Sequence, residues 1–162
     1  MSTLTISNGD MCFIPSRASP LRVGDHVTFI SSSTVLRPDS GSSGNNTSLN
    51  FLSGDDDYVL RTSFRRIVQV VSLNSRYANA NWDPEGSFKF EGPFANGKAC
   101  YVYIAVQESS YSIHIDGRLR YTYARRIIAP VVALRYASQG AGGHGNVCRV
   151  CQCVDLYHRV SP

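Results

Sequence analysis

The chain has 162 residues, of which 43% are apolar and 17% charged. This length can form one domain with a substantial hydrophobic core but hardly two stable domains. The apolar fraction is too high for a disordered chain. Sixteen basic and twelve acidic residues give a formal charge of +4, and the absence of a basic run gives nucleic-acid binding little support. No apolar segment approaches the roughly 20 residues that cross a bilayer, so membrane insertion is not expected.

The first residues carry no targeting signal that we recognise. Residues 1–7 contain neither a basic n-region nor a hydrophobic h-region. We therefore expect a cytoplasmic protein, or one that becomes extracellular by a non-classical route. Asn45-Asn46-Thr47 matches a glycosylation acceptor, but without the secretory route it is interpreted as an ordinary loop.

Strand patterns dominate the chain, and helix signals are nearly absent. Short segments rich in Val, Ile, Tyr, Phe and Thr recur at close spacing between turn residues. Strands are predicted over residues 23–30, 48–52, 58–64, 67–73, 88–90, 99–106, 111–115, 118–123, 131–136 and 147–156. The predicted fold is all-β, an antiparallel β-sandwich of roughly ten to twelve strands, with residues 1–162 as a single domain.

Turn signals separate these strands. Asp116-Gly117 is a strong two-residue hairpin signal between two predicted strands, and Asn96-Gly97 marks another turn. Residues 40–46 and 140–145 are Gly-rich and are predicted to be loops.

The side-chain alternation predicts which residues are structural. In residues 101–106, valine and isoleucine share one face while tyrosine and alanine share the other, so this strand is expected in the interior of its sheet. Phe88 and Phe90 share a face and are expected in the core. His26 and His114 lie on predicted strands with no partner pattern and are interpreted as structural.

The five cysteines are interpreted as reduced thiols, because their number is odd and no secretory signal is seen. Cys148, Cys151 and Cys153, with His144 and His158 nearby, suggest a zinc site. On a strand, however, Cys148 points away from Cys151 and Cys153, and no second cysteine pair completes a tetrahedral set. Structural thiols and no metal are therefore expected.

One group of four residues has side chains that are suited to binding a ligand. Arg65, Asn74, the single tryptophan Trp82 and Glu85 are spaced over 21 residues of strand and turn. An indole can cover the apolar C–H face of a galactose-type ring, while a guanidinium, a carboxamide and a carboxylate can donate to and accept from the hydroxyls around its rim. These residue types favour a sugar over other ligand classes.

Each residue also has a simpler interpretation. Arg65 can form an ion pair with Glu85 or Asp83 on a sheet face, Asn74 can be a turn residue, and Trp82 can be a core residue. The loop-like neighbours of Trp82 favour exposure.

The joined pattern resembles that of the galectins, and of the mushroom galectins in particular. The resemblance is strongest from about residue 45 to 127. It rests on residues 46–52, 61–65, 73–76 and 81–85, followed by Phe94-x-x-Gly97-Lys98, residues 111–117 and Tyr123-x-Arg125-Arg126-Ile127.

The resemblance assigns roles to the four residues of the constellation. It implies that Arg65 bonds the galactose 4-hydroxyl and ring oxygen, and that Asn74 holds the 6-hydroxyl. It also implies that Trp82 stacks under the ring, and that Glu85 accepts from sugar hydroxyls and orients the arginines. Ser63, on the same strand as Arg65, is included in the expected carbohydrate-binding site.

Two positions of the site depart from the family pattern at intact spacing. Arg61 stands where the family has its first His, and Ser87 where it has its last Arg. Arg61 is longer, always charged and cannot accept a hydrogen bond. It is expected to crowd the galactose subsite or to reach a second sugar, with a surface ion pair as the alternative. Ser87 is too short to reach the 3-hydroxyl of a glucose or GlcNAc. A lost hydrogen bond to a charged group costs roughly 1.5–3 kcal/mol, so lactose binding is not expected to carry over unchanged.

The functional hypothesis is a non-enzymatic lectin for β-galactoside-type or GalNAc/GlcNAc-containing glycans, with a specificity altered relative to lactose-binding galectins. The alternative is a galectin-like protein-interaction module that has lost sugar binding. An enzyme is disfavoured, because Asp83 and Glu85 flank Pro84 in one turn and no second acid recurs at strand period elsewhere on the motif.

The resemblance also bears on cofactors and assembly. It implies no cofactor, a homodimer or higher homo-oligomer, and a role in the defence of fungi against grazing animals. Residues 147–156 are suggested as an edge strand for subunit pairing.

Overall fold

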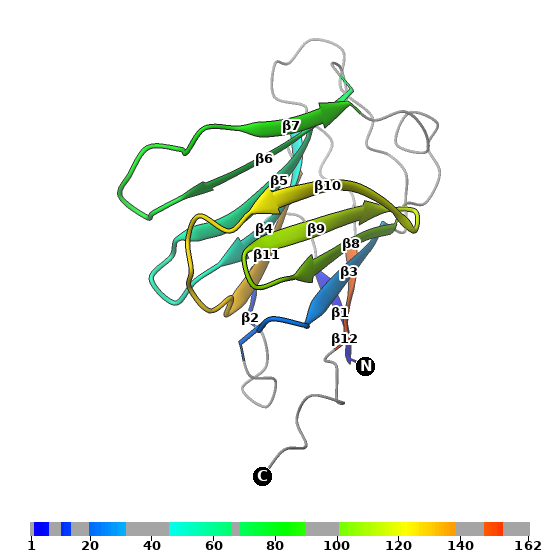
Figure 1. The fold of residues 1–162 in the computed structure, drawn as a ribbon. Coiled ribbons are helices and arrows are strands. Elements are labelled where there is room, and N and C mark those ends of the chain that lie inside the picture. The colour runs from blue at the N-terminus through cyan, green and yellow to red at the C-terminus, as the bar shows by residue number, and fades with distance from the viewer. Residues whose placement is uncertain are drawn as a thin grey trace.

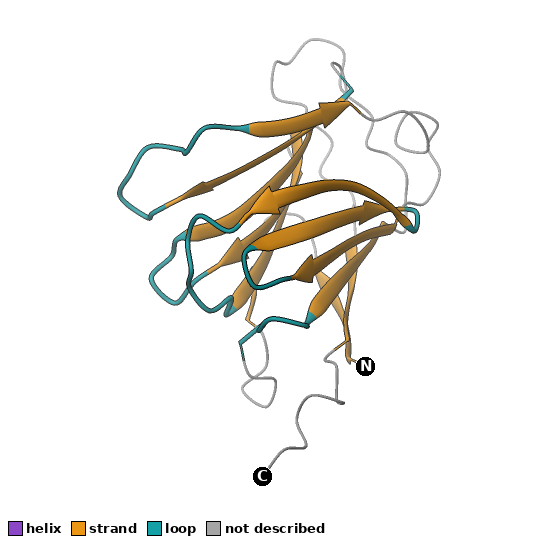
Figure 2. Cartoon of the chain, viewed as in Figure 1, coloured by secondary structure: helices purple, strands orange, loops and turns teal. Residues whose placement is uncertain are grey.

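The computed structural model describes residues 2–6, 11–13, 20–31, 46–65, 69–89, 101–138 and 148–153. The described residues form two six-stranded sheets in which every strand pair is antiparallel. The sheets face each other as two layers (Figure 1), and the described chain contains only strands and loops (Figure 2). The predicted all-β sandwich is confirmed.

Sheet 1 has the strand order β1 (Ser2–Ile6), β12 (Cys148–Cys153), β3 (His26–Ser31), β8 (Tyr101–Val106), β9 (Ser110–Ile115) and β10 (Arg118–Ala124). Sheet 2 has the order β2 (Met11–Phe13), β11 (Ala133–Ser138), β4 (Asn46–Leu52), β5 (Tyr58–Arg65), β6 (Val70–Arg76) and β7 (Gly86–Lys89). None of the segments described forms a helix able to span a bilayer.

The core lies between the two sheets. It is built from apolar residues that alternate along the strands with outward-facing polar ones. Aromatic rings of the two layers contact each other. The ring centroid of Phe51 on β4 lies 6.4 Å from that of Phe29 on β3 and 5.9 Å from that of Tyr111 on β9, which it meets edge-on. The largest fully buried side chains in the described residues are Tyr111, Phe29, Phe51, Leu60, Leu73, Ile104, Ile113, Leu134, Val27, Val59 and Val71.

All ten predicted strands occur, with shifted ends. The largest shift is at β6, predicted over residues 67–73 and found over Val70–Arg76. Its polar end continues the strand because Asn74 and Arg76 pair with Arg61 and Tyr58 of β5. The short strands β1 and β2 were not predicted, although Leu4 and Ile6 alternate with Thr3 and Thr5 in β1.

The suggestion that residues 147–156 form a sheet edge is wrong. β12 pairs with β1 on one side and with β3 on the other. The N-terminal strand β1 supplies the partner that makes this C-terminal strand an interior one.

The predicted interior strand and the predicted hairpin are both confirmed. β8 lies between β3 and β9, with Val102, Ile104 and Val106 buried. The hairpin joins β9 to β10, with positive φ angles of 49° at Asp116 and 78° at Gly117, as a type I′ turn requires.

Other predicted loops and core residues fall partly outside the description. The turn at residues 96–97, the loop at 140–145 and all but Asn46 of the loop at 40–46 lie outside the described residues. Phe88 is half-buried and packs against the core, whereas Phe90 lies outside the described residues.

Candidate functional site

The outer face of sheet 2, directed away from the core, gathers most of the candidate residues. On β5, Thr62 and Phe64 are buried, while Arg61, Ser63 and Arg65 alternate with them and take the other face. The same alternation on β6 buries Val71 and Leu73 and turns Ser72, Asn74 and Arg76 outward.

Strand register arranges these residues in rows across the sheet. The arginine–asparagine row consists of cross-strand partners Arg135, Asn50, Arg61 and Asn74. The serine row consists of Ser48, Ser63, Ser72 and Ser87. The next row beyond the serine row consists of the cross-strand partners Arg65, Val70 and Lys89. Short hydroxyl side chains thus lie between two rows that carry longer cationic and amide side chains.

Arg65 and Glu85 form a bidentate ion pair. Arg65 Nη1 donates to Glu85 Oε1 at 3.1 Å, and Nη2 donates to Oε2 at 2.5 Å. The two side chains are 41% and 33% exposed, so the pair is accessible. It uses two of the five guanidinium N–H donors, which leaves Arg65 able to donate to a ligand from a fixed orientation.

The loop between β6 and β7 carries Trp82 and Glu85 and is tied to its surroundings. Asp83 N donates to Ser75 O at 2.9 Å, and Ser75 Oγ donates to Asp83 Oδ2 at 3.1 Å. Arg126 Nη1 donates to Pro84 O at 2.5 Å. Asp83 is therefore used to hold the loop and is not the ion-pair partner of Arg65.

Trp82 is half-buried and is not part of the hydrophobic core. Its ring lies 4.6 Å from Cζ of Arg76, 5.0 Å from Cζ of Arg61 and 5.2 Å from the Tyr58 ring, tilted by 60°. The core interpretation is wrong, but the indole is also not fully open. A sugar that stacks on it must share the ring with a guanidinium or displace one.

Arg61 forms no ion pair with any residue that the structure describes, and instead lies against Trp82. Burial lowers the pKa of its guanidinium; Tyr58 and Glu85 oppose the shift, while the charges of Arg65 and Arg76 add to it. The group stays cationic, because a guanidinium is not deprotonated in proteins. Its charge is thus held among other cations.

Ser87 and Ser63 differ in accessibility. Ser87 is exposed on β7 opposite Ser72, with no long side chain to reach across the sheet. Ser63 is 3% exposed, and its Oγ, like that of Ser72, has no hydrogen-bond partner among the described residues.

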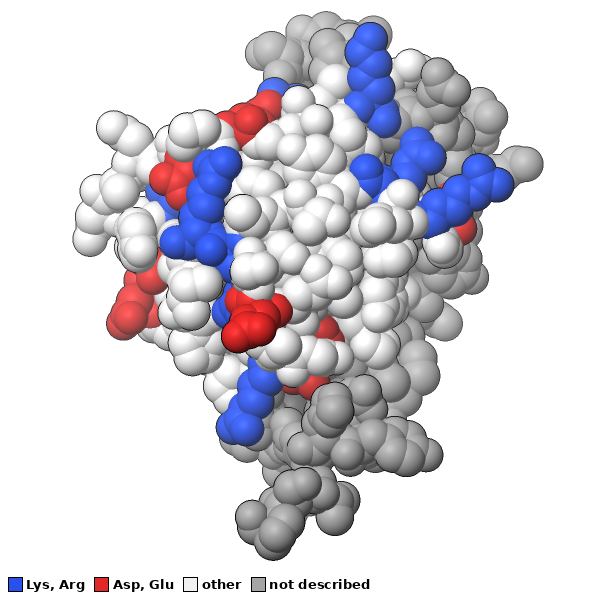
Figure 3. Space-filling model, viewed as in Figure 1, with Lys and Arg blue, Asp and Glu red and all other residues white. Residues whose placement is uncertain are grey.

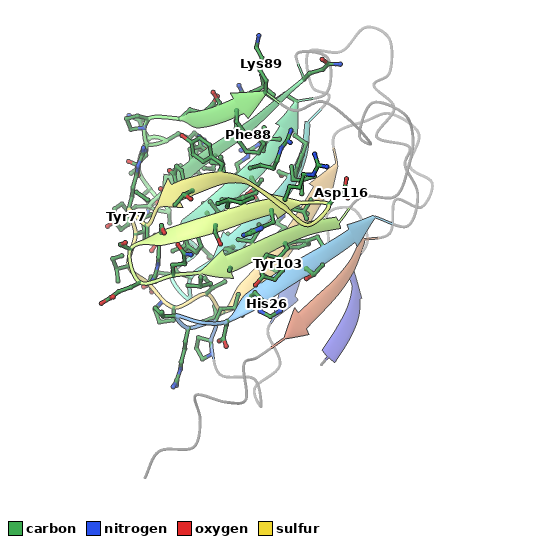
Figure 4. All side chains as sticks on the ribbon, turned by 45° about the vertical axis from the view of Figure 1, so that its right-hand side comes forward. His26, Tyr77, Phe88, Lys89, Tyr103 and Asp116 are labelled. Carbon is green, nitrogen blue, oxygen red and sulfur yellow. The ribbon has the colours of Figure 1, made fainter. Side chains whose placement is uncertain are left out.

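The remaining candidates lie elsewhere. His26 and His114 lie on sheet 1, with rings 4.7 Å and 5.1 Å from that of Tyr103, which lies between them. Figure 4 shows His26 beside Tyr103, far from the strand that carries Phe88 and Lys89. Over this sheet the centre of the surface is mostly uncharged (Figure 3). The two histidines are therefore in a ring contact remote from the site.

The prediction that Cys148 points away from Cys151 and Cys153 can be tested only through the backbone register of β12. β12 runs in unbroken register with β3, from Cys148 opposite Ser31 to Cys153 opposite His26, so Cys148 lies on the other face from Cys151 and Cys153. Their side chains, and the two histidines near them in sequence, lie outside what the structure describes. In the part of the chain described, no group of three or more His, Cys, Asp or Glu could hold a metal ion.

Four neighbours of the site were not found from the sequence: Tyr58, Arg76, Asn50 and Arg135. Arg76 follows Asn74 by two residues on one strand, and period-two alternation was a sufficient signal to include it. Arg135 depends on β11 pairing with β4, which no local pattern reveals.

The comparisons agree on one family. The family model described as galactoside-binding lectin matches residues 15–137. An anti-tumor lectin from Cyclocybe aegerita is 31% identical over 122 residues, which cover 74% of this chain and 76% of that protein.

The fold of this chain is also similar to those of solved galectin structures. Sheep galectin-11 in complex with glycerol gives a TM-score of 0.67 at 18% identity, covering 91% of this chain and 99% of that one. The galectin LEC-6 of Caenorhabditis elegans gives 0.68 at 17% identity, covering 93% and 96%.

Proposed function

The chain belongs to the galactoside-binding lectin family, and we propose that it binds β-galactoside-type or related GalNAc/GlcNAc-containing glycans on the outer face of sheet 2. We further propose that its specificity differs from that of lactose-binding members, because Arg61 and Ser87 replace two expected side chains. Galactoside-binding lectins are binding proteins and not enzymes.

One observation carries the proposal: the bidentate Arg65–Glu85 pair sits on the same sheet face as Asn74, next to the loop that bears Trp82. The pair offers oriented donors and acceptors, Asn74 offers both from one carboxamide, and the indole offers an apolar platform. A galactose ring needs this combination, since it has a C–H face and a rim of hydroxyls.

A second candidate function is a protein-interaction module without sugar binding. The observation in its favour is that Arg61 and Arg76 already contact the Trp82 ring. The two candidates differ in what the indole does, so substitution at Trp82 separates them.

The test is a glycan array probed with the protein and with Trp82→Ala. We expect bound galactosides for the protein and none for the variant, because the stacking platform is lost. Tyr77→Ala is the matched control, since Tyr77 is an exposed aromatic residue of the same loop and is expected to be dispensable. Thermal unfolding checks that both variants fold.

Two outcomes count against the lectin. Full affinity in Trp82→Ala would remove the indole from the site. An array without any bound glycan at high protein concentration, together with protein partners that co-purify, would favour the interaction module.

We also propose a homo-oligomer, an expectation that comes from the resemblance to mushroom galectins. Linked copies would convert weak single sites into avid binding to a glycan surface. Native mass spectrometry tests this, and a monomer at every concentration would contradict it.

A further inference from the structure

The strand register of sheet 1 places two cysteines and a histidine side by side on one face. On β3, Val27 is buried in the core, so its neighbours His26 and Thr28 take the outer face. β12 pairs with β3 so that Cys153 lies opposite His26 and Cys151 lies opposite Thr28. Directly opposed residues of an antiparallel pair share a face. Cys151, Cys153 and His26 therefore occupy neighbouring positions on the outer face.

The spacing of the cysteines alone did not reveal this arrangement. It suggested two histidines close to them in sequence, whereas the pairing of β12 with β3 supplies His26 from near the other end of the chain. A zinc site that includes Cys148 fails because that residue lies on the other face, but Cys151 and Cys153 share a face. The absence of a metal-binding group among the described residues does not bear on these thiols, since their side chains lie outside the description.

The backbone positions suit a small metal ion. Cys151 and Cys153 are two residues apart on one strand, which separates their Cα atoms by about 6–7 Å. The Cβ atoms of directly opposed residues, such as Cys153 and His26, are about 4.5–5.5 Å apart. Zinc binds thiolate sulfur at about 2.3 Å and imidazole nitrogen at about 2.0–2.1 Å. One zinc ion above the two strands is therefore within reach of all three positions.

The ring of His26 is held from the side of β3 that faces away from β12. Its centroid lies 4.7 Å from that of Tyr103 on β8, and β8 and β12 flank β3 on opposite sides. Figure 4 shows β12 as the next strand beside the one that carries His26. The same Tyr103 ring also contacts His114 of β9, at 5.1 Å. His114 thus shares the aromatic partner of His26 but lies two strands further from the cysteines.

We propose that Cys151, Cys153 and His26 bind a zinc ion on the outer face of sheet 1, with water in the fourth position. Two thiolates and one imidazole form a ligand set that zinc accepts. The candidate sugar site lies on the other sheet, so this inference does not rest on the proposed function. The bound ion would join β12 to β3 and stabilise the folded chain, because the unfolded chain does not hold the three ligands together.

Calorimetric titration of the reduced, metal-free protein with zinc chloride measures the binding. We expect one ion per chain, and we expect the midpoint of thermal unfolding to rise with zinc concentration. Alkylation by iodoacetamide, followed by mass spectrometry of the peptides, identifies the ligands, because the thiolate is both the nucleophile and the metal ligand. Zinc should protect Cys151 and Cys153 and leave the reactivity of Cys148 unchanged.

Variants then locate the ion. Cys151→Ser, Cys153→Ser and His26→Gln should each weaken zinc binding by at least about tenfold, since the loss of even an outer partner of a metal site costs roughly 10–100-fold. Cys148→Ser is the matched control for the thiols, because it lies on the same strand but on the other face. His114→Gln is the matched control for the imidazole. Both controls should retain the affinity, and thermal unfolding checks that each variant folds.

Each other outcome would overturn the proposal. A protein that binds no zinc has no such site, and an equal loss in either control would place the ion elsewhere. Unchanged affinity in His26→Gln would remove β3 from the site. If a ligand variant does not fold, the alkylation pattern of the unsubstituted protein decides, and unprotected Cys151 and Cys153 would contradict the proposal. Glycan binding enters none of these measurements, so the lectin proposal stands or fails separately.

Discussion

At the scale of single residues, Arg61 is the substitution that we expect to affect specificity most. It occupies the position at which the family pattern has a histidine, and its guanidinium lies against the ring on which a sugar would stack. A histidine can accept a hydrogen bond from a sugar hydroxyl, whereas a guanidinium can only donate. We therefore expect the substitution to change both the shape of the stacking platform and the pattern of sugar hydroxyls that fits it.

A double variant tests this reading. Arg61→His with Ser87→Arg should raise lactose affinity by about tenfold or more, because the acceptor returns and one charge-assisted hydrogen bond is regained. Ser87 is exposed, so the longer side chain has room. Calorimetric titration with lactose measures the change, and the single variants apportion it. An unchanged affinity would show that neither position governs lactose binding.

At the scale of elements, β7 is positioned by its contact with the opposite sheet. Phe88 stacks on Tyr121 of β10, with ring centroids 5.5 Å apart and an interplanar angle of 16°. Gly86 begins β7, and a Cβ added there would lie 3.1 Å from the Tyr121 hydroxyl and 3.3 Å from Cδ2 of Tyr123. A larger residue at the start of β7 would therefore press on the side chains of Tyr121 and Tyr123.

Gly86→Ala should lower the free energy of unfolding by about 1–3 kcal/mol, the usual cost of overpacking. It should also weaken glycan binding, because Glu85 is the preceding residue. Gly54→Ala is the matched control, since a Cβ there meets nothing within 4 Å. Urea unfolding measures both variants, and equal stabilities would show that β7 tolerates the displacement.

Some of the strands and site residues could be predicted from the sequence, and others could not. Strands such as β5, β8 and β9 were predictable because residue alternation is local, and the hairpin at Asp116-Gly117 because two residues suffice for a type I′ turn. The four-residue constellation stays a prediction from residue types and spacing, of which the structure shows the Arg65–Glu85 pair directly. The neighbours Asn50 and Arg135 were not, because they reach Arg61 only through the pairing of β11, β4 and β5. Nor did the sequence indicate that guanidiniums would lie against Trp82.

At the scale of the whole molecule, one buried hydrogen-bond chain joins both sheets to the site. The hydroxyls of Tyr123 on β10 and Ser75 on β6 are 3.1 Å apart, and Ser75 Oγ donates to Asp83 Oδ2. Since serine has one hydroxyl hydrogen, Tyr123 must be the donor to Ser75. The loop that carries Trp82 is thus anchored through the core to sheet 1.

The hydrogen-bond chain through Tyr123, Ser75 and Asp83 predicts that the folded protein loses stability at alkaline pH. The pKa of Tyr123 is raised, chiefly by burial and also by the charge of Asp83 and by Tyr121, against the opposing charge of Arg126. Folding therefore favours the neutral phenol. Its contribution to stability is fully present below about pH 10, the ordinary value for tyrosine, and is lost as the pH rises through the folded pKa.

Urea unfolding at a series of pH values above neutrality measures this loss, and Tyr123→Phe should show a shallower decline because the titrating group is gone. Tyr77→Phe is the control, since Tyr77 is 56% exposed. In the unsubstituted protein, glycan affinity should fall over the same pH range, because an ionised Tyr123 can no longer donate to Ser75 and the anchor of the Trp82 loop is lost. Parallel declines in the two variants would contradict the role of Tyr123.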